Sequence, residues 1–177
     1  MRQRRFHWEG AEETAAAIRS WTTAAAPSVD VSAIEREVRE GGDGAVLCMT
    51  ARFDATEQAP TALRVDPQAG AEALAALDSG LRESLELAAA NVRAVAEAQI
   101  TAGPKVVELS QGQTVTVREV PVSAAGLYAP GGRAAYPSSV LMCAIPAKVA
   151  GVERIALASP PGPDGKVNPL VLAAAEL

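Results

Sequence analysis

The stretch AAGLYAPGGRAAYPSS at residues 124–139 decides the fold. A short apolar strand at its start runs into a loop rich in Pro and Gly, and Ser138 or Ser139 can cap the helix that follows. The sequence at 152–159 is typical of a buried strand, and Asn168-Pro169 suits the cap and first turn of another helix. This alternation predicts a right-handed βαβ unit with a parallel sheet.

Two other patterns lie upstream of this stretch. Residues 105–109 (KVVEL) and 114–118 (TVTVR) have the alternation of a β-hairpin, with a turn at Gln111-Gly112. From residue 29 to residue 103, apolar residues recur every three or four positions, which is typical of amphipathic helices, and Gly41-Gly42 interrupts them. In the longest of these helices, the stripe expected to face the core comprises Leu81, Leu85, Ala88, Val92, Val95 and Ile100.

These patterns predict an α/β protein in two parts. Residues 1–103 form a mainly helical N-terminal region. Residues 104–177 form the β-hairpin and the first βαβ unit of a Rossmann-like, nucleotide-binding type of domain. The last helix is still apolar at Leu177, and a parallel sheet of two strands cannot bury both of its faces. We therefore expect an incomplete second domain, truncated at its C-terminus, and a chain that is the N-terminal part of a larger protein.

Composition and charge narrow the classes of function. The 177 residues include 16 Lys and Arg and 21 Asp and Glu, a formal net charge of -5, which disfavours a nucleic-acid binder of the basic-patch kind. The longest uncharged run, residues 134–147, is too short to span a bilayer and contains two prolines. Acidic residues from Glu9 onward interrupt what would be the apolar part of a signal peptide. We expect a cytoplasmic protein with no membrane or nucleic-acid partner.

The loop between the first strand and its helix is the candidate binding site. It lies where the carboxyl end of a strand meets a helix N-terminus, and open α/β sheets bind ligands there. The glycines permit close backbone approach and positive φ, and the serines and free N–H groups offer donors to an anion. Because the G-x-G-x-x-G fingerprint is absent, the alternative of a plain turn with packing tyrosines stays open. The residues expected to bind a cofactor are Tyr128, Pro130, Gly131, Gly132, Ser138 and Ser139.

No catalytic residue and no metal ligand is predicted in this chain. Its single histidine, His7, lies near the N-terminus, and one imidazole cannot make a His-rich zinc site or a Ser-His-Asp triad without partners. Cys48 and Cys143 are far apart in the sequence and form no C-x-x-C motif, so neither a disulfide framework nor a thiolate metal cluster is indicated. We expect Cys143, between two apolar neighbours, to be a small core residue.

Several segments in order resemble the histidinol dehydrogenase family. They are GLYAPGG at 126–132, AYPSSVLM at 135–142, AIPAKVAGV at 144–152 and SPP at 159–161. Upstream, GDGA at 42–45 and TARFD at 50–54 also resemble family segments, so the resemblance covers nearly the whole chain.

The resemblance implies an enzyme that oxidises L-histidinol to L-histidine, the last steps of histidine biosynthesis, with two hydride transfers to NAD and a bound zinc ion. It also implies a homodimer with intertwined α/β domains. In that family the Tyr of the GLYxPGG segment touches NAD, which carries over to Tyr128. The family's zinc ligands and its Glu-His acid/base pair belong to segments beyond residue 177. The resemblance therefore implies that this chain alone holds at most part of the cofactor pocket and is inactive by itself.

Two alternatives stay open at this stage. One is a non-catalytic fragment or assembly module with the same fold. A His-bearing metal segment downstream in the reading frame favours the enzyme, whereas a stop codon after Leu177 favours the module. The other is a sister dehydrogenase acting on another amino or sulfonated alcohol, because the contacts that select the substrate lie downstream. The exact alcohol then rests on analogy with the family.

Overall fold

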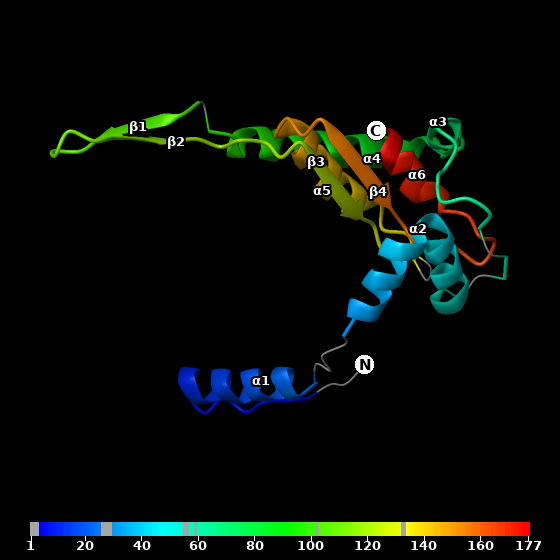
Figure 1. Cartoon of the computed structure of the whole chain (residues 1–177), viewed down its shortest axis with the longest axis horizontal. Coiled ribbons are helices and arrows are strands. Elements are labelled where there is room, and N and C mark those ends of the chain that lie inside the picture. The colour runs from blue at the N-terminus through cyan, green and yellow to red at the C-terminus, as the bar shows by residue number, and fades with distance from the viewer. Residues whose placement is uncertain (1–3, 26–29, 55–56, 59, 102, 132–133) are drawn as a thin grey trace. The chain divides into compact units, whose positions relative to one another are not determined.

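The structure is a computed structural model that describes residues 4–25, 30–54, 57–58, 60–101, 103–131 and 134–177. The chain forms two compact units, Met1–Gly42 and Asp43–Leu177. The elements are labelled in Figure 1. No helix in the described part of the chain is both long enough and apolar enough to cross a membrane.

The first unit holds α1 (Ala11–Ala25) and the beginning of α2 (Ser32–Phe53). The ring of Phe6 packs edge-to-face on Trp21 of α1, with the ring centroids 5.9 Å apart. Within α2, Gly42 has φ 55° and ψ -141°, so two helical segments meet there. The expected interruption at Gly41-Gly42 is confirmed, because Gly adopts this backbone conformation without a Cβ clash.

The second unit combines helices with two small sheets. Its helices, besides the end of α2, are α3 (Gln68–Ala75), α4 (Ser79–Gln99), α5 (Pro137–Val149) and α6 (Pro169–Glu176). Strands β1 (Lys105–Glu108) and β2 (Thr114–Val117) form the predicted antiparallel hairpin. Strands β3 (Ala124–Tyr128) and β4 (Arg154–Ala158) pair in parallel, with α5 as the connection. The α/β class and the βαβ order of elements are confirmed.

Local capping explains where several helices begin and end. The side chain of Asp78 accepts the Leu81 N–H at 2.9 Å, and that of Asn168 accepts the Leu170 N–H, also at 2.9 Å. Gly151, with φ 86°, follows the end of α5. The expected cap of α5 is wrong. This helix begins at Pro137, so Ser138 and Ser139 lie inside its first turn, and the preceding residue makes no side-chain capping bond.

The core lies between α4, α5 and α6. Its buried members are Leu85, Ala129, Val140, Leu141, Ile145, Val171 and Ala174. The predicted stripe of α4 is confirmed for Leu85, which is buried, and for Leu81, Ala88 and Val92, which pack against the core.

The same stripe is wrong for Val95 and Ile100. Val95 is 60% exposed, because the buried side of the last turns of α4 contains Ala96 and not Val95. Ile100 is 46% exposed and lies at the C-cap, after the last helical residue. Val95 instead lines an apolar groove of about 330 Å³ with Met142 and Pro146 of α5.

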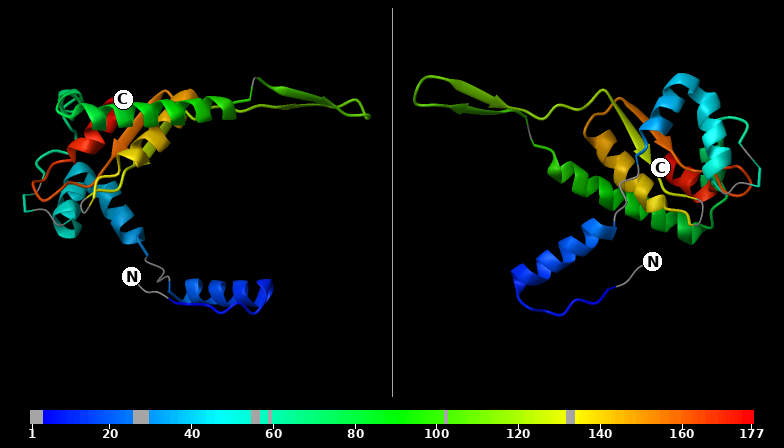
Figure 2. Two further views of the ribbon diagram at one scale, coloured as in Figure 1. Left: turned by 180° about the vertical axis from the view of Figure 1, so that it is seen from behind. Right: turned by 60° about the horizontal axis from the view of Figure 1, so that its bottom comes forward.

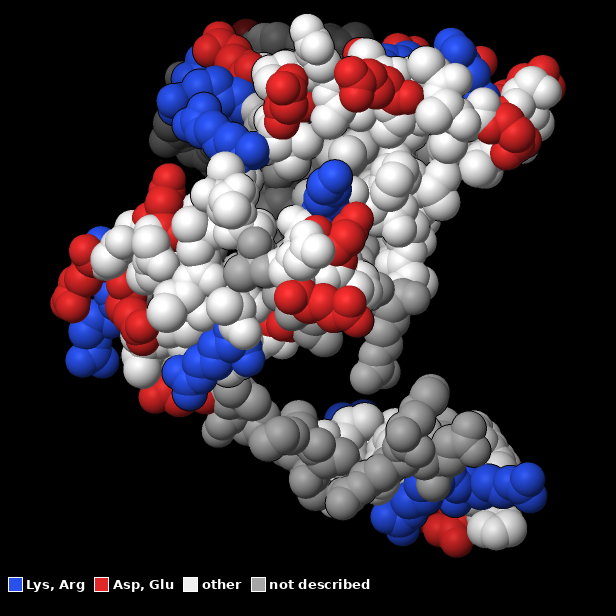
Figure 3. All heavy atoms as spheres, turned by 90° about the vertical axis from the view of Figure 1, so that its right-hand side faces the viewer, with Lys and Arg blue, Asp and Glu red and all other residues white. Residues whose placement is uncertain are grey.

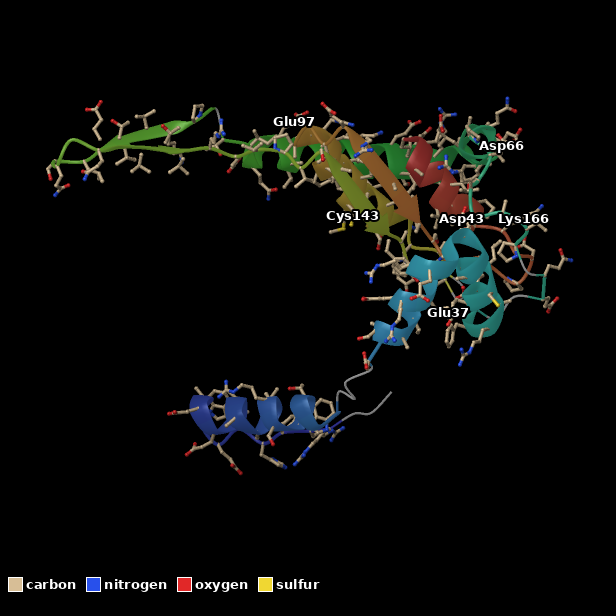
Figure 4. All side chains as sticks on the ribbon, viewed as in Figure 1. Glu37, Asp43, Asp66, Glu97, Cys143 and Lys166 are labelled. Atoms are coloured by element: carbon tan, nitrogen blue, oxygen red, sulfur yellow. The ribbon has the colours of Figure 1, made fainter. Side chains whose placement is uncertain are left out.

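Cys143 is also placed differently from the prediction. It is exposed, because the turn of α5 that directs Val140, Leu141 and Ile145 into the core directs Cys143 outward (Figure 4). The helix is apolar on nearly every side, so its sequence does not mark the side that packs.

The parallel sheet is covered on one face by helices (Figure 2). Leu127 and Leu157 are half-buried and point to this face, where Leu157 packs against the core. Alternate residues are exposed on the opposite face, which consists of Ala124, Gly126, Tyr128, Arg154, Ala156 and Ala158. The prediction of a fully buried strand at 152–159 is therefore wrong for β4, since residues 154, 156 and 158 have no covering layer in the described part of the chain.

Candidate functional site

The carboxyl ends of β3 and β4 lie next to each other. Their register pairs Tyr128 with Ala158, the last residue of each strand. One residue further on, the Ala129 N–H donates to the Ala158 carbonyl oxygen at 2.9 Å, and Ala129 is buried. The loops that follow the two strands therefore start from a fixed point at the same sheet edge, where ligands bind in open α/β sheets.

Gly131 lies against the loop that follows β4. A Cβ atom built on Gly131 would be 3.0 Å from Ser159 Oγ, 3.1 Å from the Pro160 carbonyl oxygen and 3.2 Å from Pro160 Cγ. Gly131 does not have a positive φ, so this reason expected for the glycine does not apply. The tight space beside Ser159 and Pro160 favours glycine instead.

Ser159 is not among the predicted site residues. Its hydroxyl oxygen is buried and has no hydrogen-bond partner in the described structure. The signal that could have found it is its position, because it directly follows the second strand at the edge where the Pro-Gly-Gly loop follows the first.

Tyr128 has an exposed side chain at the end of β3. Its side chain is 65% exposed on the uncovered face of the sheet. The neighbours on this face include Gly126, Ala156 and Ala158, which leave a flat surface of small side chains around the ring. A flat, partly apolar group can pack on such a surface.

The other predicted residues provide few hydrogen-bond donors in the described structure. The Ser139 N–H donates to the Tyr136 carbonyl oxygen at 3.1 Å, and Pro137 has no N–H. The first turn of α5 thus offers an anion little more than the Ser138 N–H and two hydroxyl groups. Pro130 is exposed beside Gly131, and Gly132 lies outside the described residues.

The described residues do not fit a zinc ion. No group of three or more His, Cys, Asp and Glu side chains among them could hold a metal. On the face drawn in Figure 3, Lys and Arg are intermixed with Asp and Glu, so that face has no continuous basic surface among the described residues.

Comparison with known proteins identifies the family. A family model described as "Histidinol dehydrogenase" matches residues 18–177. This chain belongs to the histidinol dehydrogenase family.

Curated family members agree closely with it. Histidinol dehydrogenase from Ruegeria pomeroyi is 49% identical over 153 residues, which are 85% of this chain and 35% of that protein. The one from Methanosarcina barkeri is 44% identical over 147 residues, 83% of this chain and 34% of that protein. The crystal structure of histidinol dehydrogenase from Elizabethkingia anophelis superimposes with a TM-score of 0.75 at 28% identity, over 85% of this chain and 35% of that one. The chain thus spans about a third of the length of these histidinol dehydrogenases.

Proposed function

We propose that this chain forms the NAD-binding part of a histidinol dehydrogenase that oxidises L-histidinol to L-histidine. The observation that carries the proposal is the close approach of Gly131 to Ser159 and Pro160, at the joined carboxyl ends of two parallel strands. The family membership supports the reaction, and this edge is where open α/β sheets bind ligands.

The residues present fit NAD. The buried Ser159 hydroxyl lacks a partner in the described structure, and a Cβ on Gly131 would be crowded by Ser159 and Pro160. A ligand bound at this edge would therefore meet backbone and a hydroxyl group. Tyr128 offers its ring on the open face of the sheet. We assign cofactor binding to Tyr128, Pro130, Gly131, Gly132, Ser138 and Ser139.

The division of labour follows from what these residues can do. NAD, when bound, supplies the acceptor for each hydride. Tyr128 orients the cofactor by packing or hydrogen bonding. Gly131 has no side chain, so the cofactor can come close to the backbone there. We assign no acid or base step to the residues of this edge, because the resemblance to the family implies that these steps belong to segments beyond residue 177.

The wider setting belongs to the same proposal. Zinc and the substrate L-histidinol bind to residues outside this chain, the working enzyme is a cytoplasmic homodimer, and residues 1–177 are inactive alone. We also propose that residues 1–103 are a mainly helical N-terminal region and that residues 104–177 are the start of an α/β domain of the nucleotide-binding type.

The test uses the full-length protein and residues 1–177 in parallel. NADH absorbance is followed with L-histidinol, and with other amino or sulfonated alcohols as controls. We expect NADH from L-histidinol with the full-length protein and none with residues 1–177. Preference for a different alcohol would correct the substrate. Absence of NADH with every alcohol would favour a non-catalytic module.

A further inference from the structure

The Ser159 hydroxyl is an unusual group in this unit. Its oxygen is buried and has no partner among the described residues, although a hydroxyl can rotate to find one. A buried hydroxyl that gives up water without gaining a hydrogen bond lowers the stability of the fold. Stability therefore does not explain why this position has a serine.

The position of Ser159 places it at the cofactor edge. It follows Ala158, the last residue of β4, which pairs with Tyr128. A Cβ atom on Gly131 would come within 3.0 Å of its hydroxyl oxygen. The hydroxyl thus lies directly beneath the loop that follows β3.

Hydrogen-bond donors are scarce at this edge. Pro130, Pro160 and Pro161 have no N–H, and the Ala129 N–H is taken by the Ala158 carbonyl oxygen. The three prolines therefore reduce the number of backbone donors that this edge offers to an anionic ligand. The Ser159 hydroxyl is a side-chain donor without a competing acceptor in the described structure.

We infer that the Ser159 hydroxyl donates a hydrogen bond to a phosphate oxygen of the bound dinucleotide. The inference rests on the proposed function and adds to it a residue and the ligand group it recognises. A phosphate oxygen is the partner of choice because a hydrogen bond to a charged acceptor is stronger than one to a neutral acceptor. Gly131 and Pro160 must separate slightly to admit it, which a glycine without a side chain allows.

The variant Ser159→Ala in the full-length protein tests this inference by two readouts. Without ligand, the melting temperature should stay the same or rise, because the substitution removes an unpaired buried hydroxyl. The Kd for NAD, measured by calorimetry, should rise about 10-fold. ADP-ribose keeps the pyrophosphate and lacks nicotinamide, so its Kd should rise by the same factor. The KM for L-histidinol should not change.

Ser84→Ala is the matched control. The Ser84 hydroxyl donates to the Gly80 carbonyl oxygen at 2.8 Å on the exposed surface of α4, so its loss should leave the Kd for NAD unchanged. Inorganic phosphate serves as a second probe. If Ser159→Ala weakens the binding of NAD and of inorganic phosphate equally, the hydroxyl binds any phosphate group. If it weakens only the binding of NAD and ADP-ribose, the hydroxyl recognises the phosphate of the dinucleotide.

Two results overturn the inference while leaving the proposed function in place. One is unchanged affinity of Ser159→Ala for NAD where the wild-type protein binds it. The other is a clear fall in melting temperature or a failure to fold, which would give the hydroxyl a structural role. A wild-type protein that binds no NAD would instead overturn the proposed function and the inference together.

Discussion

The Ala129 N–H donates to the Ala158 carbonyl oxygen at 2.9 Å, one residue beyond the last pair of β3 and β4. This bond continues the parallel ladder into the two loops. It explains why Ala129, a loop residue by its backbone, is 1% exposed and belongs to the core. The bond fixes the starting point of the loop that holds Gly131, at the sheet edge proposed for the cofactor.

Substitution of Gly131 should damage both folding and cofactor binding. In Gly131→Ala the new Cβ would meet Ser159 Oγ at 3.0 Å and the Pro160 carbonyl oxygen at 3.1 Å. We expect a loss of about 1–3 kcal/mol in the free energy of unfolding from this crowding, measured by urea denaturation, and weaker NAD binding. Gly131→Val should do at least as much harm.

Gly126→Ala is the control for that series. A Cβ on Gly126 meets nothing within 4 Å, and Gly126 lies in the same strand as Tyr128. Its stability should change little or rise by about 0.5–1 kcal/mol from the smaller chain entropy. Equal damage in Gly126→Ala and Gly131→Ala would show that crowding at Ser159 is not the cause.

Tyr128→Ala should separate cofactor binding from stability. The side chain is 65% exposed, so unfolding in urea should shift by no more than about 0.5 kcal/mol. NAD binding should weaken by roughly 1–2 kcal/mol if a stacking or hydrogen-bonding contact is lost, with less effect on alcohol binding. Tyr128→Phe tells the two contacts apart, because it keeps the ring. Unchanged NAD affinity in Tyr128→Ala would leave this residue without a role in the cofactor site.

The cap of α6 gives a prediction about stability alone. Asn168→Ala removes the acceptor of the Leu170 N–H, so we expect a loss of about 1 kcal/mol in the free energy of unfolding. Asn168→Asp should retain nearly all of the wild-type stability, since Asp caps equally well. Chemical denaturation measures both variants. If Asn168→Asp and Asn168→Ala were equally unstable, the loss would come from something other than the cap.

The β1–β2 hairpin should drive self-association of residues 1–177. Its register places Val107 opposite Val115 and Lys105 opposite Val117 on one face, and all four side chains are exposed. Together with the open edges of the β3–β4 sheet, this face should make the isolated chain oligomerise in dilute buffer. Light scattering should show smaller particles for Val115→Lys.

Thr116→Lys is the control on the opposite face of the same strand, where Val106 is its partner. It should leave the particle size unchanged. A monodisperse monomer of the unmodified chain would contradict the expectation altogether.

Much of this fold could be predicted from local patterns. The hairpin and the βαβ unit follow from the change of period near residue 104, and the cap at Asn168 follows from its position before Pro169. These features depend on neighbours in sequence, so a single sequence contains them.

The errors concern features that depend on distant segments. The sequence of α5 is apolar nearly all round, so only packing against α4 and α6 shows that Val140 faces inward and Cys143 outward. The unpartnered hydroxyl of Ser159 likewise cannot be read from the sequence, because it depends on how the loop with Gly131 packs against Ser159 and Pro160. The sheet edge proposed for the cofactor could be predicted from the sequence, whereas the proposed donor could not.

A crystal structure of the full-length protein with NAD tests the central claim most directly. We predict cofactor density at the carboxyl ends of β3 and β4, with the ring of Tyr128 in contact and the pyrophosphate next to Gly131 and Ser159. Clear density for NAD at another place in the protein, with Tyr128 and Gly131 free of contact, would contradict it.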